Sequence, residues 1–367
     1  MKHKLTVYHY RYLTVSETFI YRQLQALNRV FDLTLLTHAV ENRNDFAGLA
    51  PILAPRRSVI NTATGRQKRF FLRYLRDSRL FHVNFGHHAV DVQEYAALAG
   101  IPMTVYFLGV DASAWLRDAW YRKKLRTSQF AAVFVNSEDM KRRLLPFLPP
   151  GTRCHVAYVG IALERFPFQE HTTLPDDGIF LQVSRLVPKK GADISLRAFS
   201  LYLRDFPKAE LLIAGDGPLR RDLEKLMRSL GIEKSVKFLG SIGYDRYVEL
   251  LHGAHAYLQP SLTAMDGDME GLPTAVCEAM ASGLPVISTR HSGIPEVIDD
   301  GIDGLLANEG DAEGLYARMR QLKESNISRI SRQARMKIEQ KFDHMKSIES
   351  FCRRLTDIIG GNESDAA

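Results

Sequence analysis

Short runs of β-branched and aromatic residues alternate along the chain with segments long enough to form a helix. This alternation is typical of βαβ units, in which helices connect parallel strands. In the first part we expect a helix from Glu17 to Asn28 and strands at 5–10, 33–39, 80–86, 103–109, 130–137 and 155–161. In the second part the pattern repeats at 179–185, 209–217, 236–240, 256–261, 285–289 and 304–308. The sequence therefore predicts an α/β protein with two doubly wound domains.

The length of the chain, 367 residues, also favours two domains, each with its own core. The stretch FPFQEHTTLPDD has no periodicity, so we place the boundary between Leu163 and Pro175. The predicted domains are residues 1–165 and 176–345. Sheets of this kind bind ligands at the carboxyl ends of their strands, so a ligand shared by both domains is expected in the cleft between them.

The composition, 45% hydrophobic and 25% charged, is ordinary for a globular protein. No apolar run reaches 18 residues, and no signal-peptide core precedes the strand-like KLTVYHY. We therefore expect a cytoplasmic protein without a membrane span or signal peptide. The three cysteines form no C-x-x-C or Cys/His cluster, which indicates a reducing compartment and no zinc site.

Positive charge is concentrated in the first part of the chain. Residues 1–150 hold 22 Lys and Arg against 11 Asp and Glu, a net +11, whereas residues 151–367 hold 27 against 31, a net −4. Basic and aromatic residues interleave in two clusters: Arg56, Arg57, Arg66, Lys68, Arg69, Phe70, Phe71, Arg73, Tyr74, Leu75, Arg76 and Arg79, and Trp120, Tyr121, Arg122, Lys123, Lys124 and Arg126. Such clusters suit peripheral docking to the anionic inner face of a membrane, and the alternative is a solvated basic surface.

The stretch 266–296 carries the strongest signal for a ligand. A polar loop ends at Glu270, and Pro273 is tolerated in the first turn of a helix. The helix should end before Gly283, because glycine is a natural C′ residue and Pro285 prevents continuation. The free N–H groups of residues 272–275 and the positive end of the helix dipole then form a site for a phosphate.

Two carboxylates flank this helix start. Glu270 precedes the helix and Glu278 lies a turn and a half inside it, so they are roughly 8 Å apart along the axis. A pyrophosphate between them would place one carboxylate near each flanking group, and carboxylates accept hydrogen bonds from vicinal hydroxyls. The simplest such ligand is a nucleotide sugar, and the alternative is a helix with solvated glutamates. The loop HSG should approach this ligand closely, since Gly293 allows close backbone contact.

Other strand ends of the second domain add compatible chemistry. Ser184 follows a strand, and Arg185 and Lys190 are in a position to reach a pyrophosphate, although a basic surface loop explains them as well. The turn AGDGP, with Gly215, lacks the third glycine of GxGxxG, so we do not expect a nicotinamide site. The loop FLGSIGYD, with Ile242, would lie beside a nucleotide base.

Together these segments resemble glycosyltransferase family four, retaining enzymes of the GT-B architecture. The resemblance rests on VSRLVPKKG, LLIAGDGPLRRDLE, VKFLG and EGLPTAVCEAMASGLPVISTRHSGIPEVI, in family order over residues 179–310. In the first domain SETFIYRQLQAL, FHVNFG and FLGVDAS are similar to the subgroup that builds bacterial exopolysaccharides such as colanic acid and amylovoran. The resemblance implies GT-B folding, with residues 346–360 as a last helix that crosses back to the N-terminal domain.

The resemblance also implies roles for individual residues. Arg185 and Lys190 would hold the pyrophosphate of the donor. Glu270 would contact the sugar hydroxyls and Glu278 the ribose hydroxyls. The sugar and phosphate would also contact the backbone of Gly271, Leu272, Pro273 and Thr274, all of which except the proline have an N–H group to donate. The donor would be a UDP- or GDP-sugar, and the acceptor, a lipid-linked glycan or an oligosaccharide, would be bound by the N-terminal domain.

The chain departs from the family on the acceptor side. Leu108 stands where many members have a histidine, and Asn84 replaces the second histidine of an HAHFG-like segment in which His82 is retained. We therefore consider His87 and His88 as substitutes, with Asp111 of FLGVDAS beside them. A structural role for either histidine is the alternative.

Charge stabilisation is the expected mechanism. Breaking the bond between the anomeric carbon and the diphosphate builds negative charge on the leaving phosphate, which Arg185, Lys190 and the helix N-terminus would stabilise. In other sugar-transfer sites a divalent metal stabilises this charge. Asp266, Asp268 and Glu270 form a D-x-D-x-E run that could be mistaken for a metal site. Since Glu270 is assigned to the sugar, we expect a metal-independent transfer without a cofactor. Since no obvious nucleophile is present at the anomeric face, we expect same-face attack by the acceptor hydroxyl, which retains the anomeric configuration.

Three other functions are compatible with parts of the sequence. A nucleic-acid-binding protein would explain a pI of about 9.2, but it leaves Glu270 and Glu278 without a role, so we expect no nucleic-acid partner. A GT-B sugar phosphorylase or nucleotide-sugar epimerase would use the same donor site. A noncatalytic family member is suggested by Leu108.

Overall fold

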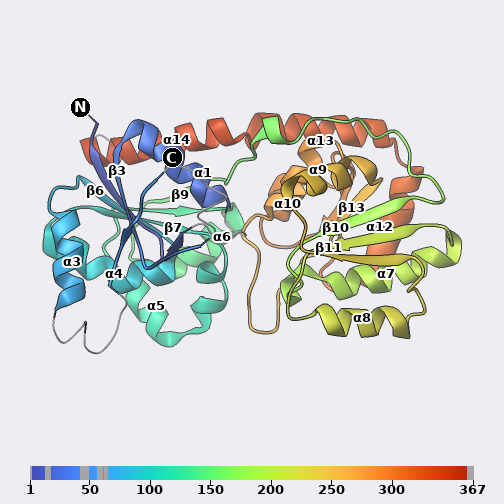
Figure 1. The fold of residues 1–367 in the computed structure, drawn as a ribbon, viewed down its shortest axis with the longest axis horizontal. Coiled ribbons are helices and arrows are strands. Elements are labelled where there is room, and N and C mark those ends of the chain that lie inside the picture. The colour runs from blue at the N-terminus through green and yellow to red at the C-terminus, as the bar shows by residue number, and fades with distance from the viewer. Residues whose placement is uncertain (1, 13–17, 42–48, 56–60, 62–64, 362–367) are drawn as a thin grey trace. The chain divides into compact units, whose positions relative to one another are not determined.

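The structure is a computed structural model that describes residues 2–12, 18–41, 49–55, 61 and 65–361 (Figure 1). Arg56 and Arg57 of the basic cluster, and the residues at the expected start of the first helix, lie outside this range. The chain forms two compact units, Met1–Val159 with Lys346–Ala367, and Gly160–Met345. The second unit thus begins at Gly160, and residues 160–165, which we assigned to the first domain, belong to it. The reason is local pairing, since Ile161 forms a β-bridge with Asp343.

The first unit is built on a parallel sheet of seven strands in the order β5-β3-β1-β6-β7-β8-β9. Each predicted strand of this part is present: β1 (Lys4–Tyr8), β3 (Asp32–Thr37), β6 (Leu80–Asn84), β7 (Met103–Phe107), β8 (Ala132–Val135) and β9 (Cys154–Val156). The sequence did not predict three two-residue strands: β2 (Arg11–Tyr12), β4 (Ala39–Val40) and β5 (Ile52–Leu53).

Helices cover both faces of this sheet. One face packs Phe71, Ala89, Tyr121 and Leu144 from α3 (Arg66–Leu75), α4 (Gly86–Ala99), α5 (Ala119–Arg126) and α6 (Glu138–Leu144). The opposite face packs Leu24 and Phe351 from α1 (Thr18–Val30) and α14 (His344–Gly360). Short 3-10 helices follow β7 and α6: η3 (Val110–Ala112), η4 (Ala114–Arg117) and η5 (Leu145–Phe147).

The second unit contains a parallel sheet of six strands in the order β12-β11-β10-β13-β14-β15. Its strands are β10 (Ile179–Val183), β11 (Glu210–Ala214), β12 (Val236–Gly240), β13 (Ala256–Gln259), β14 (Val286–Thr289) and β15 (Leu305–Ala307). The connections are η6 (Leu163–Arg165), η7 (Pro188–Lys190), α7 (Ala192–Asp205), α8 (Arg220–Ser229), α9 (Tyr244–Gly253), α10 (Thr274–Ala281), α11 (Ile294–Val297), α12 (Ala312–Glu324) and α13 (Ile327–Lys341). The predicted pair of doubly wound α/β domains is therefore confirmed.

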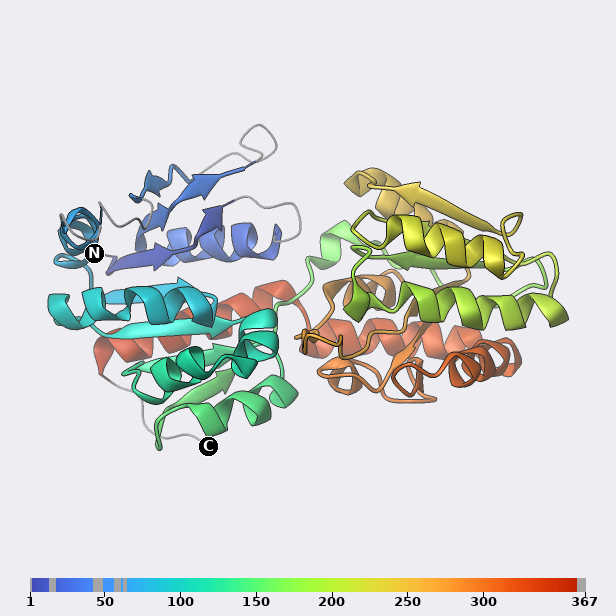
Figure 2. The ribbon, with the colours of Figure 1, turned by 90° about the horizontal axis from the view of Figure 1, so that it is seen from below.

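The layers of the second unit place the predicted donor residues at one edge of its sheet. Residues of α7, α8 and α12 pack on one face, and α9 and α10 approach the other (Figures 1 and 2). Because all the strands are parallel, the loops after β10, β11, β12, β13 and β14 leave the sheet at its carboxyl edge. Within the described residues no helix is long and apolar enough to cross a bilayer.

Candidate functional site

The helix α10 has the boundaries that its proline and glycine predict. It spans Thr274–Ala281 after Pro273, with no side chain capping its start. Gly283, just past its end, has φ +86°, the left-handed conformation expected of a C′ glycine. Among the described residues, no carbonyl or side chain accepts the N–H groups of Leu272, Thr274 or Ala275. These donors are therefore available to an anion.

Glu270 and Lys190 form a close pair in front of this helix. Lys190 Nζ lies 2.6 Å from Glu270 Oε1, and both side chains are largely buried. Burial raises the pKa of Glu270, but Lys190 and Lys189 outweigh it, and the resulting pKa lies below the ordinary value. Glu270 is thus a buried carboxylate that carries its charge at neutral pH, ready to accept hydroxyl hydrogen bonds.

Lys189 stabilises the loop that leads to Glu270. Its ammonium donates to Asp268 Oδ1 at 3.0 Å and to the carbonyl of Met269 at 3.2 Å. The Lys189 side chain is buried, so these two contacts order the segment immediately before the helix. The sequence analysis predicted a role in ligand binding for Lys190 but no role for Lys189.

The segment after β14 contacts the same loop. The Glu270 N–H donates to His291 Nε2 at 3.0 Å, and Ser292 Oγ donates to the Glu270 carbonyl at 2.7 Å. Gly293 N–H donates to the Gly271 carbonyl at 3.3 Å. The HSG segment thus contacts the backbone of residues 270–271, and its close approach to a ligand stays a prediction. Gly293 itself has φ −76°, and the left-handed residue is Ser292 at φ +47°.

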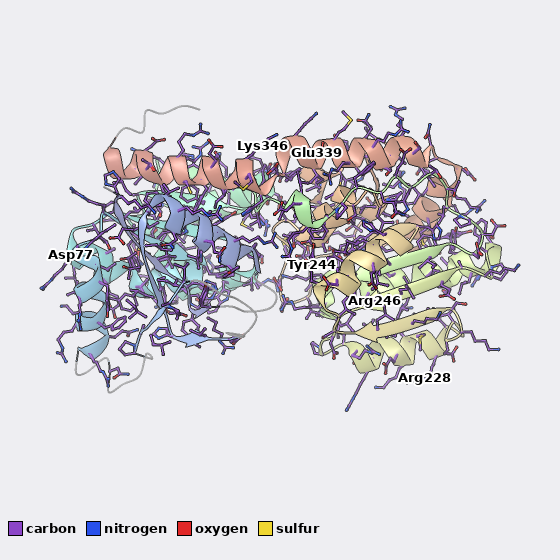
Figure 3. The ribbon with its side chains drawn as sticks, turned by 45° about the horizontal axis from the view of Figure 1, so that its top comes forward. Asp77, Arg228, Tyr244, Arg246, Glu339 and Lys346 are labelled. Atoms are coloured by element: carbon purple, nitrogen blue, oxygen red, sulfur yellow. The ribbon has the colours of Figure 1, made fainter. Side chains whose placement is uncertain are left out.

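Glu278 is held by α9. Tyr247 donates its hydroxyl to Glu278 Oε2 at 3.0 Å. Burial and then the nearby Glu278 charge raise the pKa of Tyr247 well above its ordinary value, so the phenol keeps its proton. At the start of α9 the Arg165 guanidinium lies 3.6 Å from the centre of the Tyr244 ring, and Figure 3 shows Tyr244 on this helix. Ile242 is half-buried in the loop before α9.

The loops after β10 and β11 pack directly against each other. Ser184 N–H donates to the Ala214 carbonyl at 3.0 Å, and a Cβ at Gly215 would overlap the Ser184 carbonyl oxygen. Ser184 Oγ is buried and has no hydrogen-bond partner in the described part of the chain. Arg185 is exposed, and no described residue forms an ion pair or hydrogen bond with its guanidinium. The Arg185 guanidinium is thus available to a ligand, whereas Ser184 Oγ is unpartnered but shielded from solvent.

The carboxylates of the D-x-D-x-E run do not converge on one point. Asp268 pairs with Lys189 and Glu270 with Lys190, while Asp266 Oδ1 accepts the Asp268 N–H at 2.9 Å. In the residues that the structure describes, no group of three or more His, Cys, Asp or Glu side chains is arranged to hold a metal ion.

In the first unit, Asp111 accepts hydrogen bonds from backbone N–H groups. Its buried carboxylate accepts N–H groups from Gly86 at 2.7 Å, Gly109 at 2.9 Å and Leu108 at 3.1 Å. These bonds join the start of α4 to the loop after β7. Leu108, at the position of the family histidine, therefore contributes its backbone to this arrangement.

His87 and His88, in the first turn of α4, are part of an aromatic stack. His87 stacks on Trp115 with ring centres 5.0 Å apart, and His88 stacks on Tyr10 at 4.7 Å. Burial, together with nearby histidines, lowers the pKa of His88 to about 2, so its ring is neutral. His82, by contrast, is inside the sheet, where its Nδ1 lies 2.9 Å from Thr104 Oγ1.

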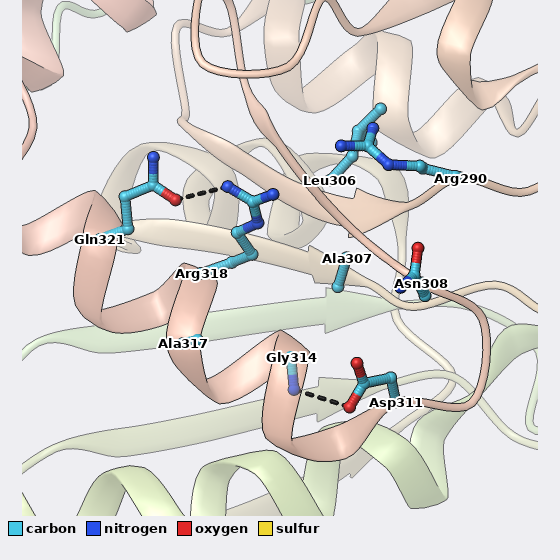
Figure 4. Close-up of a pocket in the computed structure, with 9 residues that line it drawn as sticks. All are labelled: Arg290, Leu306, Ala307, Asn308, Asp311, Gly314, Ala317, Arg318 and Gln321. Carbon is cyan, nitrogen blue, oxygen red and sulfur yellow. Dashed lines mark hydrogen bonds between the residues drawn. The ribbon is translucent and has the colours of Figure 1, made fainter.

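A cavity of about 440 Å³ lies elsewhere in the second unit, between β15 and α12 (Figure 4). Arg290 and Arg318 line it, and both pair with Asp300 Oδ2, at 2.6 Å and 3.3 Å. Asp311, which also lines it, adds a second negative charge. The cavity includes none of the predicted donor residues and has no excess positive charge for a phosphate.

Comparisons with known proteins show which sequences this chain is similar to. The family described as Glycosyl transferases group 1 matches residues 165–341. The amylovoran biosynthesis glycosyltransferase AmsK of Erwinia amylovora is 33% identical over 72% of this chain and 66% of its own length. The putative colanic acid biosynthesis glycosyltransferase WcaL of Salmonella typhimurium is 34% identical over 75% of this chain and 68% of its own length. This chain thus spans about two thirds of each relative.

Solved structures share the fold at low sequence identity. Anabaena Alr3699/HepE, crystallised with UDP and glucose, has a TM-score of 0.80 and 17% identity, covering 97% of this chain and 100% of that one. The lipopolysaccharide outer core galactosyltransferase WaaB, in its apo form, has a TM-score of 0.75 and 15% identity, covering 98% and 100%.

Proposed function

Because the chain belongs to the group 1 glycosyl transferase family, with the GT-B fold, we propose that it transfers a hexosyl group from a UDP- or GDP-sugar to a glycan acceptor in exopolysaccharide or lipopolysaccharide synthesis. The observation that carries this proposal is the pairing of Glu270 with Lys190 in front of an uncapped helix start. An uncapped start binds phosphate, and a charged, buried carboxylate beside it binds sugar hydroxyls.

The proposed chemistry is a retaining transfer. The bond between the anomeric carbon and the phosphate oxygen breaks, and its electron pair stays on that oxygen. The acceptor hydroxyl forms the new bond on the same face, and its proton passes to the departing diphosphate. Arg185, Lys190 and the N–H groups of residues 271, 272, 274 and 275 stabilise the negative charge, while Glu270 orients the sugar and Glu278 the ribose. No catalytic step in this scheme uses a metal or another cofactor.

A thermal-shift screen with nucleotide sugars tests the donor site. We expect one UDP- or GDP-sugar, at 100 times its Kd, to stabilise the protein by roughly 2.7 kcal/mol and to raise Tm by roughly 5–10 °C. The similar HepE structure contains UDP and glucose, so UDP-glucose is the first compound to screen. A screen in which no nucleotide sugar shifts Tm would refute the proposed donor class.

Product analysis then separates transfer from the related reactions. A transferase forms a new glycoside only when a glycan acceptor is present, and the product keeps the anomeric configuration of the donor. An epimerase changes the donor without an acceptor, and a phosphorylase needs inorganic phosphate. We expect transfer at the full rate in the presence of EDTA, and loss of transfer on chelation would contradict metal independence. A product with the inverted anomeric configuration would contradict the retaining mechanism.

We further propose that the acceptor is lipid-linked and that the first unit docks on an anionic cytoplasmic membrane surface. Arg69, Arg73 and Arg76 are exposed on or just after α3, whereas Phe71 and Leu75 are buried beneath them. On α5 the exposed Trp120 lies under Lys124, whose Nζ is 5.6 Å from the ring centre. The chain therefore presents basic side chains and an exposed aromatic ring, the features of an interfacial surface. His87 and His88 are the proposed acceptor contacts of this unit.

Vesicle sedimentation tests the docking surface. Replacing Arg69 and Arg73 by glutamine should weaken binding to phosphatidylglycerol-containing vesicles roughly 30-fold, since each basic side chain near the surface contributes about 1 kcal/mol. The double variant Arg221→Gln/Arg228→Gln removes the same charge from α8 and should bind as the wild type does (Figure 3). Equal binding to vesicles with and without anionic lipid would rule out this surface as a membrane-docking site. Tight binding of nucleic acid that nucleotide sugars do not reduce would instead favour the nucleic-acid-binding alternative.

A further inference from the structure

His291 and Glu309 join the two ends of the loop that precedes α10. Glu309 Oε2 accepts the Thr263 N–H at 2.7 Å, near the start of that loop. Glu309 Oε1 lies 2.7 Å from His291 Nδ1, and His291 Nε2 accepts the Glu270 N–H at 3.0 Å, at its end. Two side chains from the segments after β14 and β15 thus fix both ends of residues 263–270.

The partners of the imidazole determine its tautomer. Nε2 faces an N–H group and must accept, whereas Nδ1 faces a carboxylate and must donate. The neutral ring with its proton on Nδ1 satisfies both contacts at once. His291 is fully buried, so it has no solvent to replace either partner, and the loss of one contact leaves a buried polar group unsatisfied.

The pair fixes the position of Glu270, whereas Lys190 and Lys189 contribute more than His291 to holding the pKa of Glu270 below its ordinary value. Lys190 holds the Glu270 carboxylate, His291 holds its N–H, and Ser292 holds its carbonyl. The side chain and backbone of one residue are therefore fixed by three neighbours. The N–H groups of residues 271, 272, 274 and 275, proposed to bind the phosphate, belong to the next segment of the chain and do not depend on His291 for a hydrogen bond.

We propose that His291 and Glu309 are positioning residues that set the contact between Glu270 and the sugar of the donor, and so govern selection of the sugar but not binding of the nucleotide. This inference rests on the proposed function. It implies that a perturbed pair weakens the binding of a nucleotide sugar while the corresponding nucleoside diphosphate binds as before. A residue that only supports the fold would weaken both.

Titration calorimetry with UDP, GDP and the matching nucleotide sugars tests the proposal. We expect His291→Ala and Glu309→Ala to lower nucleotide-sugar affinity about 10- to 100-fold, because one buried hydrogen bond is lost, and to leave nucleoside diphosphate affinity within about twofold. Glu309 is one-third exposed, so its alanine variant tests the idea even if His291→Ala fails to fold. In a Glu270→Ala background, His291→Ala should have little further effect, since both act through one contact.

Two conservative variants separate the two halves of the imidazole. The side-chain oxygen of His291→Gln is in place to accept the Glu270 N–H, whereas the shorter His291→Asn reaches only the Glu309 side. Glutamine should therefore restore more nucleotide-sugar affinity than asparagine. The inference would be overturned if His291→Ala lowered the affinities for the nucleoside diphosphate and for the nucleotide sugar equally. It would also be overturned if His291→Ala had its full effect in the Glu270→Ala background. A wild-type protein that binds no nucleotide sugar overturns the proposed function itself and this inference with it.

Discussion

Alanine in place of Arg185 should lower kcat for sugar transfer about 10²- to 10³-fold, the usual cost of removing one group that stabilises charge in the transition state. The exposed Arg185 guanidinium makes no ion pair or hydrogen bond with the described residues, so its loss should not change Tm. A single-turnover assay with a saturating donor measures this effect without interference from product release.

Lys190→Ala should match that loss in rate and should also destabilise the protein. Lys190 is the ion-pair partner of the buried Glu270, and removing one member of a buried pair leaves the other charge uncompensated. The control is Lys225→Ala, which removes an exposed lysine paired with Asp222 on α8 and should leave rate and Tm unchanged. If Arg185→Ala turns over at the wild-type rate, these residues do not stabilise the leaving group.

Gly215→Ala should destabilise the second unit by about 3 kcal/mol. Gly215 has φ +119°, where residues with a side chain are strained, and its Cβ would overlap the carbonyl oxygen of Ser184, a backbone atom that has little freedom to move. The matched control is Gly231→Ala, because Gly231 has φ +68° but open space around it, and should cost only about 1 kcal/mol.

Hydrogen exchange of peptides from β10 and β11 measures this difference directly. Tryptophan fluorescence is unsuitable, because both tryptophans, Trp115 and Trp120, belong to the first unit. A Gly215→Ala protein whose β10 and β11 amides exchange no faster than those of Gly231→Ala would contradict the close packing of these loops.

The sequence predicted the regular parts of the fold because their signals are local. The buried strands appear as apolar runs, and Val236–Gly240 has the predicted bounds. Pro273 and Gly283 mark the ends of α10 to within one or two residues, since both act through their own backbone. The two-residue strands β2, β4 and β5 were missed because two residues carry no periodicity.

The contacts around the site were not predictable because they join distant segments. Lys189 and Asp268 are 79 residues apart, and Tyr247 and Glu278 are 31 apart. The loop HSG was noted for Gly293, whereas the contacts with Glu270 come from His291 and Ser292. The role of Asp111 was not predictable either, because an aspartate after a strand is typical both of a ligand contact and of a residue that accepts hydrogen bonds from backbone N–H groups.

A crystal structure of this protein with a nucleotide-sugar donor tests the central claim most directly. We expect the diphosphate to contact the N–H groups of residues 271, 272, 274 and 275 with Arg185 and Lys190 beside it, the sugar hydroxyls to contact Glu270, and the ribose to contact Glu278. A donor bound elsewhere, for example between Arg290 and Arg318, with the start of α10 unoccupied, would contradict it.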